Sequence, residues 1–91
     1  MPVLDPRQTS SSLRTKGFKL VEKHHHFFEF WVNNKMVART RMSHNNQEIN
    51  SYLIGQMSRQ CHLTRNDFIA LVECPLTKDG YIKKLKDQGI I

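Results

Sequence analysis

The stretch His24-His-His-Phe-Phe-Glu-Phe-Trp-Val32 decides the fold. It contains neither Gly nor Pro, and its aromatic and β-branched side chains favour the pleated backbone of a β-strand. Asn33-Asn34 follows it, and asparagine adopts the positive φ angles that a two-residue hairpin turn requires. The return segment Met36–Met42 alternates between two faces, so we expect an antiparallel β-hairpin.

The sequence before this hairpin predicts one more strand and a short helix. Gly17–Glu22 alternates apolar with other side chains, which is typical of a half-buried strand. A helix is expected to begin at Ser10 or Ser11 as its N-cap and to end at Gly17. Residues 1–12 hold two prolines and a serine run without an apolar period, so we expect a flexible N-terminal tail there.

After the hairpin the apolar period changes from two to four. From Gln47 onward, an amphipathic helix is predicted by the spacing of Ile49, Leu53, Met57 and Cys61. The polar run Ser43–Asn46 supplies candidate caps for this helix. Thr64-Arg-Asn-Asp67 resembles a capping box that opens a second, short helix. Thr77 is a candidate cap for a third helix, which is expected to end at Gly89.

This order of elements predicts an α+β fold with a three-stranded antiparallel sheet. Runs of strands followed by runs of helices place the helices on one face of the sheet. The other face is then left for solvent or for a ligand. With 91 residues the chain fits one domain with a thin core, which we place at residues 13–91. We therefore expect any chemistry on a surface or in a shallow groove.

The composition is basic. Fourteen Lys and Arg against eight Asp and Glu give a net charge of +6 at pH 7 and a pI of about 9.7. Such a charge attracts polyanions, although solubility alone also accounts for it. The two cysteines form neither a disulfide framework nor a C-x-x-C pair. No run of ~18 apolar residues and no secretion signal is present, so we expect reduced thiols, no membrane and a cytoplasmic location.

The histidine run could carry acid–base chemistry, because the ordinary pKa of histidine, about 6.5, lies near neutrality. Strand alternation places His24 and His26 on one face and His25 on the other. Arg39 and Arg41 lie on the next predicted strand, where guanidinium groups could hold a phosphate. A histidine beside a phosphodiester held by arginines would allow RNA cleavage by the 2′-hydroxyl, with no metal or cofactor.

Other interpretations of these residues stay open. The histidines could be polar strand residues, or His24 and His26 could bind zinc with a third ligand. The candidates for that further ligand are His44, Cys61 and His62. The aromatic residues of the strand could stack bases or could form the core. Phe27 and Trp31 are the two whose role is open, because they lie opposite Phe28 and Phe30.

Two segments resemble the start of HicA-type toxins. They are Leu13-Arg-Thr-Lys-Gly17-Phe18 and Glu22-Lys-His-His-His26-Phe-Phe. Asn46–Leu63 looks like the closing helix of that family, so the resemblance covers residues 13–63. It implies a double-stranded-RNA-binding-like fold with the order α-β-β-β-α. It also implies metal-independent cleavage of mRNA, with His26 as the catalytic histidine and His25 second, and silencing by a HicB-type antitoxin protein.

The chain departs from the family pattern in two places. Lys23-His24 stands where the family has Gly-Ser before the histidine, and the chain continues as Thr64–Ile91 beyond the usual end of the family. We interpret this extension as a helical cap or a partner-binding surface. The phosphate-binding set that we expect consists of Lys23, His24, Lys35, Arg39 and Arg41.

Three functions therefore follow as hypotheses. The first is a HicA-like ribonuclease that acts on mRNA. The second is a module on the same fold that binds RNA or DNA without cleaving it, which the missing Gly-Ser favours. The third is a protein-interaction subunit, in which the apolar side chains of residues 68–90 contact a partner or a second copy of the chain.

Overall fold

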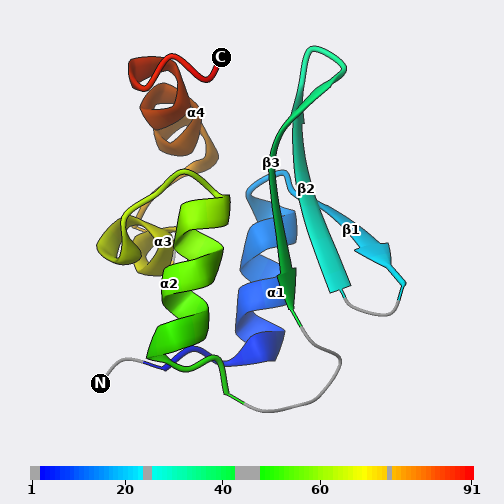
Figure 1. Ribbon diagram of the computed structural model, residues 1–91, viewed down its shortest axis with the longest axis vertical. Coiled ribbons are helices and arrows are strands. Elements are labelled where there is room, and N and C mark those ends of the chain that lie inside the picture. The colour runs from blue at the N-terminus through cyan, green and yellow to red at the C-terminus, as the bar shows by residue number, and fades with distance from the viewer. Residues whose placement is uncertain (1–2, 24–25, 43–47, 74) are drawn as a thin grey trace.

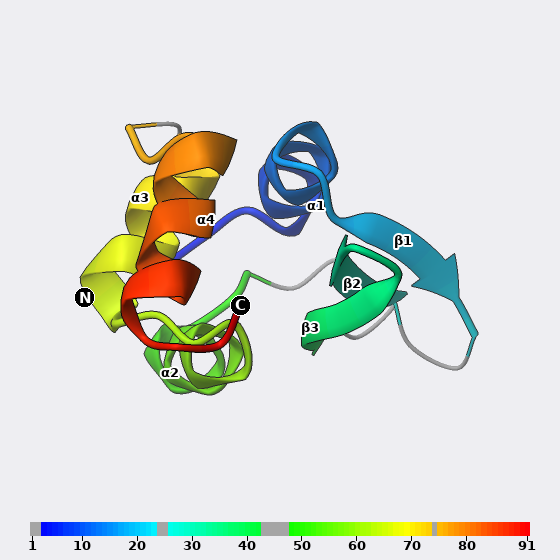
Figure 2. The ribbon, with the colours of Figure 1, turned by 90° about the horizontal axis from the view of Figure 1, so that it is seen from above.

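The computed structural model describes residues 3–23, 26–42, 48–73 and 75–91. Its elements are, in chain order, α1 (Pro6–Thr15), β1 (Lys19–Glu22), β2 (His26–Val32), β3 (Lys35–Met42), α2 (Ser51–Gln60), α3 (Arg65–Glu73) and α4 (Lys78–Asp87). The strands form one antiparallel sheet in the order β1-β2-β3. The helices lie on one side of this sheet (Figures 1 and 2). The predicted α+β fold with a three-stranded antiparallel sheet is confirmed.

The hairpin between β2 and β3 has the predicted turn. Asn33 and Asn34 have φ angles of 52° and 65°, which continue the right-handed twist of the flanking strands. The register pairs Phe30 with Ala38 but Trp31 with Met36, so Val37 is an extra residue in β3. This β-bulge bends β3 near the hairpin tip. The period of the return strand therefore changes at residue 37, which the even alternation of the sequence did not indicate.

The core joins the sheet to the last helix of the chain. The ring of Tyr81 in α4 lies 5.6 Å from that of Phe18 and 5.0 Å from that of Phe30, measured between centroids. Phe68 and Leu71 of α3 are fully buried in the same cluster. The expectation that residues 68–90 present their apolar side chains to a partner is therefore wrong for the largest ones. They complete the core of this one domain.

The predicted flexible tail over residues 1–12 is also wrong from Leu4 onward. Asp5 is the N-cap of α1, and its carboxylate accepts a hydrogen bond from the backbone N–H of Arg7 at 3.2 Å. Pro6 occupies the first turn, where its fixed φ suits a helix and its missing N–H costs nothing. Thr9 is fully buried, and its hydroxyl donates to the carbonyl of Asp5. The N-cap of the helix is thus Asp5, five residues before Ser10, the earlier of the two predicted N-caps.

The helix after the sheet begins later than predicted. Its N-cap is Asn50, whose side chain accepts from the N–H of Leu53 at 3.0 Å. The predicted caps at residues 43–46 lie outside the described residues. Ile49 is buried, but it forms an antiparallel bridge with Leu4 and is not part of the helix. Leu53 belongs to the apolar period and is nevertheless 41 % exposed. The apolar period of the sequence therefore covers two different structures, the bridge at Ile49 and helix α2.

The remaining helix ends follow the sequence signals. The hydroxyl of Thr64 accepts from the N–H of Asp67, and that of Thr77 accepts from the N–H of Gly80. Gly17 and Gly89 take φ angles of 100° and 75° just beyond α1 and α4. Glycine adopts this left-handed conformation without steric cost, so both predicted helix ends are confirmed.

Candidate nucleic-acid interface

The face of the sheet that points away from the helices is solvent-exposed. Phe28 and Phe30 of β2 point to the helices and are buried, so the alternate residues of each strand point outward. Figure 2 shows this side of the sheet without a covering helix. We call it the open face, and it consists of Lys19, Val21, Phe27, Glu29, Trp31, Met36, Arg39 and Arg41.

Exposed apolar side chains occupy the hairpin end of the open face. Trp31 is 49 % exposed and its cross-strand partner Met36 is 41 % exposed. The indole Nε1 of Trp31 donates a hydrogen bond to Oε1 of Glu29 at 3.1 Å, which restricts the orientation of the ring. Trp31 is therefore not part of the core, and its indole is available for stacking.

The cations of the open face lie beside its second aromatic ring. Arg39 and Arg41 are exposed, and the register pairs Arg41 directly with Phe27. The guanidinium carbon of Arg39 lies 4.2 Å from the centroid of the Phe27 ring, in cation–π contact. With Lys19 the face carries three cations and one carboxylate, that of Glu29. Its charge is therefore positive.

A shallow hollow of about 230 Å³ lies along the outer edge of β3. It is lined by Phe27, Arg39, Thr40, Arg41 and Gln60. The hydroxyl of Thr40 donates to Oε1 of Gln60 at 2.7 Å, which leaves the amide Nε2 of Gln60 as a donor. Two guanidinium groups and an amide thus line a hollow whose lining contains no carboxylate. Such a set of donors suits a phosphate group.

His26 lies on the other side of the sheet from the two arginines. Its cross-strand partner is Met42, which is buried, whereas Arg39 and Arg41 alternate with these inward positions. The imidazole side chain is 27 % exposed, and its Nε2 lies 3.8 Å from Oε1 of Glu22. The structure therefore does not bring His26 and these arginines together. His24 and His25 lie outside the described residues.

Only some of the predicted phosphate-binding residues lie close to one another. Arg39 and Arg41 share the open face, whereas Lys35 begins β3 at the hairpin turn and Lys23 follows the end of β1. Lys19 and Gln60 were not among the predicted residues. Alternation in β1 could have indicated Lys19, but nothing in the sequence points to Gln60, which approaches β3 only through the packing of α2 on the sheet.

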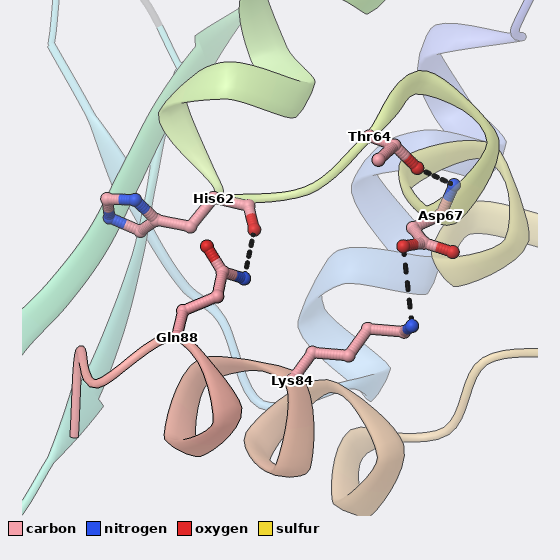
Figure 3. Close-up of polar contacts among 5 residues, drawn as sticks. All are labelled: His62, Thr64, Asp67, Lys84 and Gln88. Atoms are coloured by element: carbon pink, nitrogen blue, oxygen red, sulfur yellow. Dashed lines mark hydrogen bonds and ion pairs between the residues drawn. The ribbon is translucent and has the colours of Figure 1, made fainter.

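A second hollow, of about 520 Å³, lies between the α2–α3 turn and α4. Five of the residues that line it, His62, Thr64, Asp67, Lys84 and Gln88, form polar contacts with one another (Figure 3). Nζ of Lys84 lies 3.3 Å from Oδ2 of Asp67, and the amide nitrogen of Gln88 donates to the carbonyl of His62 at 2.7 Å. These contacts attach α4 to the rest of the domain. We therefore interpret this hollow as a structural junction.

Two of the residues considered for zinc binding, His62 and Cys61, have other roles in the described part of the chain. The ring Nε2 of His62 lies 3.1 Å from the carbonyl of Val37 in the bulge, and this contact requires a proton on Nε2. Cys61 is fully buried, and burial raises the pKa of its thiol to about 12. Within the described ranges, no three His, Cys, Asp or Glu side chains lie close enough to hold a metal ion together. His44 and Cys74 lie outside those ranges.

Comparison with known proteins adds no relative. No family model, no curated protein and no solved structure matches the chain. In the part of the chain that the structure describes, no helix combines the length and the apolar character needed to cross a bilayer. The function must therefore be argued from the open face itself.

Proposed function

We propose that this protein binds single-stranded RNA on the open face of its sheet. The observation that carries the proposal is the contact of Arg39 with the Phe27 ring beside the exposed indole of Trp31. Exposed aromatic rings stack unpaired bases, and each stacked base contributes about 1–3 kcal/mol. Cations among the rings hold the phosphates between those bases. A duplex would keep its bases from these rings, so the proposal names a single strand.

The arrangement of charges fits a chain of phosphates. Arg39 and Arg41 are two residues apart on one strand, so their side chains point to the same side. The hollow beside them has the donor set for one phosphate, with Gln60 as the third donor. Lys19 lies on β1, on the other side of the central strand, where it can contact another phosphate.

Fluorescence anisotropy of a labelled nine-nucleotide RNA tests this proposal. We expect the double variant Arg39→Ala/Arg41→Ala to bind much more weakly and its affinity to depend less on salt, by a slope of about 0.7 for each lost phosphate contact. The matched control is Arg14→Ala/Lys83→Ala, which removes two exposed cations from α1 and α4. Equal dissociation constants for the two double variants would contradict the proposal.

A second candidate is cleavage of mRNA in the manner of HicA-type toxins. The observation that favours it is the Glu22 carboxylate 3.8 Å from Nε2 of His26, because a carboxylate can orient an imidazole that transfers a proton. The element order of α1, three strands and α2 also agrees with the α-β-β-β-α order of that family. In this proposal a HicB-like antitoxin would cover the site. The phosphate at the cleaved bond would have to be bound by cations other than Arg39 and Arg41, for example by Lys23.

Incubation of mRNA with the protein in EDTA tests this candidate. Cleavage should occur without metal and should be lost in His26→Ala, while Glu22→Gln should slow it. Because the arginines of the open face lie on the other side, Arg39→Ala should weaken RNA binding more than it slows cleavage. RNA that stays equally intact with wild type and with His26→Ala would rule out catalysis by His26.

A further inference from the structure

Glu29 is a carboxylate at the centre of a surface that is otherwise basic. It lies on the central strand β2, and the register places it between Lys19 of β1 and Arg39 of β3. On a surface that binds polyanions, a carboxylate in this place repels phosphates. Directly opposed charges on neighbouring strands would ordinarily form ion pairs that offset this repulsion.

The contacts of Glu29 are different. Among the described residues, the ion pairs within 4.0 Å include none between Glu29 and either neighbouring cation. Arg39 instead places its guanidinium on the Phe27 ring. Glu29 accepts a hydrogen bond from the indole of Trp31 through Oε1. A carboxylate has about four acceptor positions, and this bond occupies one of them.

The Glu29 carboxylate is thus held at the edge of the Trp31 indole, the ring on which a base would stack. We infer that Glu29 selects guanine among the bases bound on the open face, an inference that rests on the proposed RNA binding. Guanine presents two parallel donors on its Watson–Crick edge, N1–H and the N2 amino group. A carboxylate accepts both at once, as it accepts the two parallel N–H groups of an arginine.

The other bases match this acceptor less well. Uracil offers one donor, N3–H, between two carbonyl oxygens that the carboxylate repels. Adenine and cytosine each offer a single amino group on that edge, next to a ring nitrogen that can only accept. A bidentate pair to the matching base contributes roughly a fivefold to hundredfold preference over a mismatched base. This contact involves the base and not the phosphates. The carboxylate repels the phosphates, which bind to Arg39 and Arg41 instead.

The experiment compares three RNA oligonucleotides by fluorescence anisotropy at one salt concentration. They are U9, the same chain with guanine at its centre, and the same chain with inosine there, which lacks the N2 amino group. We expect the wild type to bind the guanine oligonucleotide roughly tenfold more tightly than U9, with inosine between them. Glu29→Gln should bind all three with similar affinity, because the amide nitrogen replaces one acceptor by a donor.

Glu73→Gln is the matched control, since it removes the same charge from an exposed side chain of α3, which packs on α1 and α2, and should keep the preference. Wild-type protein that binds the three oligonucleotides equally would overturn the inference and leave the proposed RNA binding in place. A Glu29→Gln variant that keeps the guanine preference would also overturn it. If the wild type binds none of the three, the proposed function and this inference both fail.

Discussion

Arg39 places its guanidinium 4.2 Å from the centroid of the Phe27 ring, although its direct cross-strand neighbour is the carboxylate of Glu29. This diagonal contact joins the middle and the outer strand of the open face. It orders one of the two guanidinium groups of that face against a flat ring, so less conformational freedom is lost when RNA binds. It also leaves the Glu29 carboxylate to the indole of Trp31.

The first prediction concerns the shape of this cation. Arg39→Lys keeps the charge but loses the planar group that covers the ring, so RNA binding should weaken about two- to fivefold while its salt dependence changes little. Arg39→Ala should weaken binding further and lower the salt slope. Anisotropy titrations from 50 to 300 mM salt separate the two effects. An Arg39→Lys variant that binds RNA as tightly as the wild type would show that only the charge matters.

The second prediction concerns stacking on the indole. Trp31→Ala should lower RNA affinity by about 1–3 kcal/mol, the contribution of one stacked base, and leave the unfolding temperature nearly unchanged. Tyr52→Ala is the control, because Tyr52 is 66 % exposed on α2 and does not belong to the open face. If Tyr52→Ala lowers the RNA affinity as much as Trp31→Ala does, the proposed binding of RNA on the open face is contradicted.

The third prediction concerns the C-terminal helices. A chain that ends at Leu63 should lack cooperative unfolding, because the rings of Phe18 and Phe30 lose their contact with Tyr81. Circular dichroism and light scattering should show an unfolded or aggregated species. In the full chain, Tyr81→Phe removes only the hydrogen bond to the carbonyl of Cys61 and should cost about 1 kcal/mol. A folded, monodisperse 63-residue chain would contradict this account of the core.

The fourth prediction concerns stability in alkaline solution. Burial raises the pKa of the Cys61 thiol from 9.0 to about 12. Below pH 9 the thiol keeps its proton in both states, so its full contribution to stability is present. Between pH 9 and 12 the unfolded chain releases the proton first, and the free energy of unfolding falls by up to about 1.4 kcal/mol per pH unit. Burial, together with the charge of Cys61, also raises the pKa of Tyr81, which adds to this decline.

Urea unfolding at pH 8, 9 and 10 measures this dependence. Cys61→Ala lacks the thiol, so its free energy of unfolding should decline less steeply than that of the wild type above pH 9. Its lower stability at pH 8, caused by the smaller side chain, is a constant offset that does not affect the comparison of slopes. Equal slopes for the two proteins would show that the thiol is not held protonated by the fold.

The sequence predicted those parts of the fold in which local signals and packing agree. The hairpin at Asn33-Asn34 and the helix end at Gly17 need particular backbone angles, and residues that adopt these angles stand there. The start of the first helix was placed too late because its first turns are polar and the side chains that they bury, Thr9 and Ser12, are not hydrophobic. Burial of these hydroxyl groups depends on packing between helices, which a pattern of apolar residues does not register.

The candidate site was predicted less completely, because it depends on which side of the sheet each residue occupies. Alternation alone separates His26 from Phe27, and the register of β3 then places Arg41 beside Phe27 rather than beside His26. The predicted site grouped Arg39 and Arg41 with His26, which lies on the other side of the sheet. Register depends on contacts across strands, and a shift of one residue exchanges the faces.

The most direct test of the central claim uses the fluorescence of Trp31, which is the one tryptophan of the chain. Titration with a nine-nucleotide single-stranded RNA at low salt should quench this emission to saturation, and added salt should restore it as the phosphates are released from Arg39 and Arg41. Emission that stays unchanged while the RNA is shown to bind by anisotropy would place the RNA elsewhere and contradict the account.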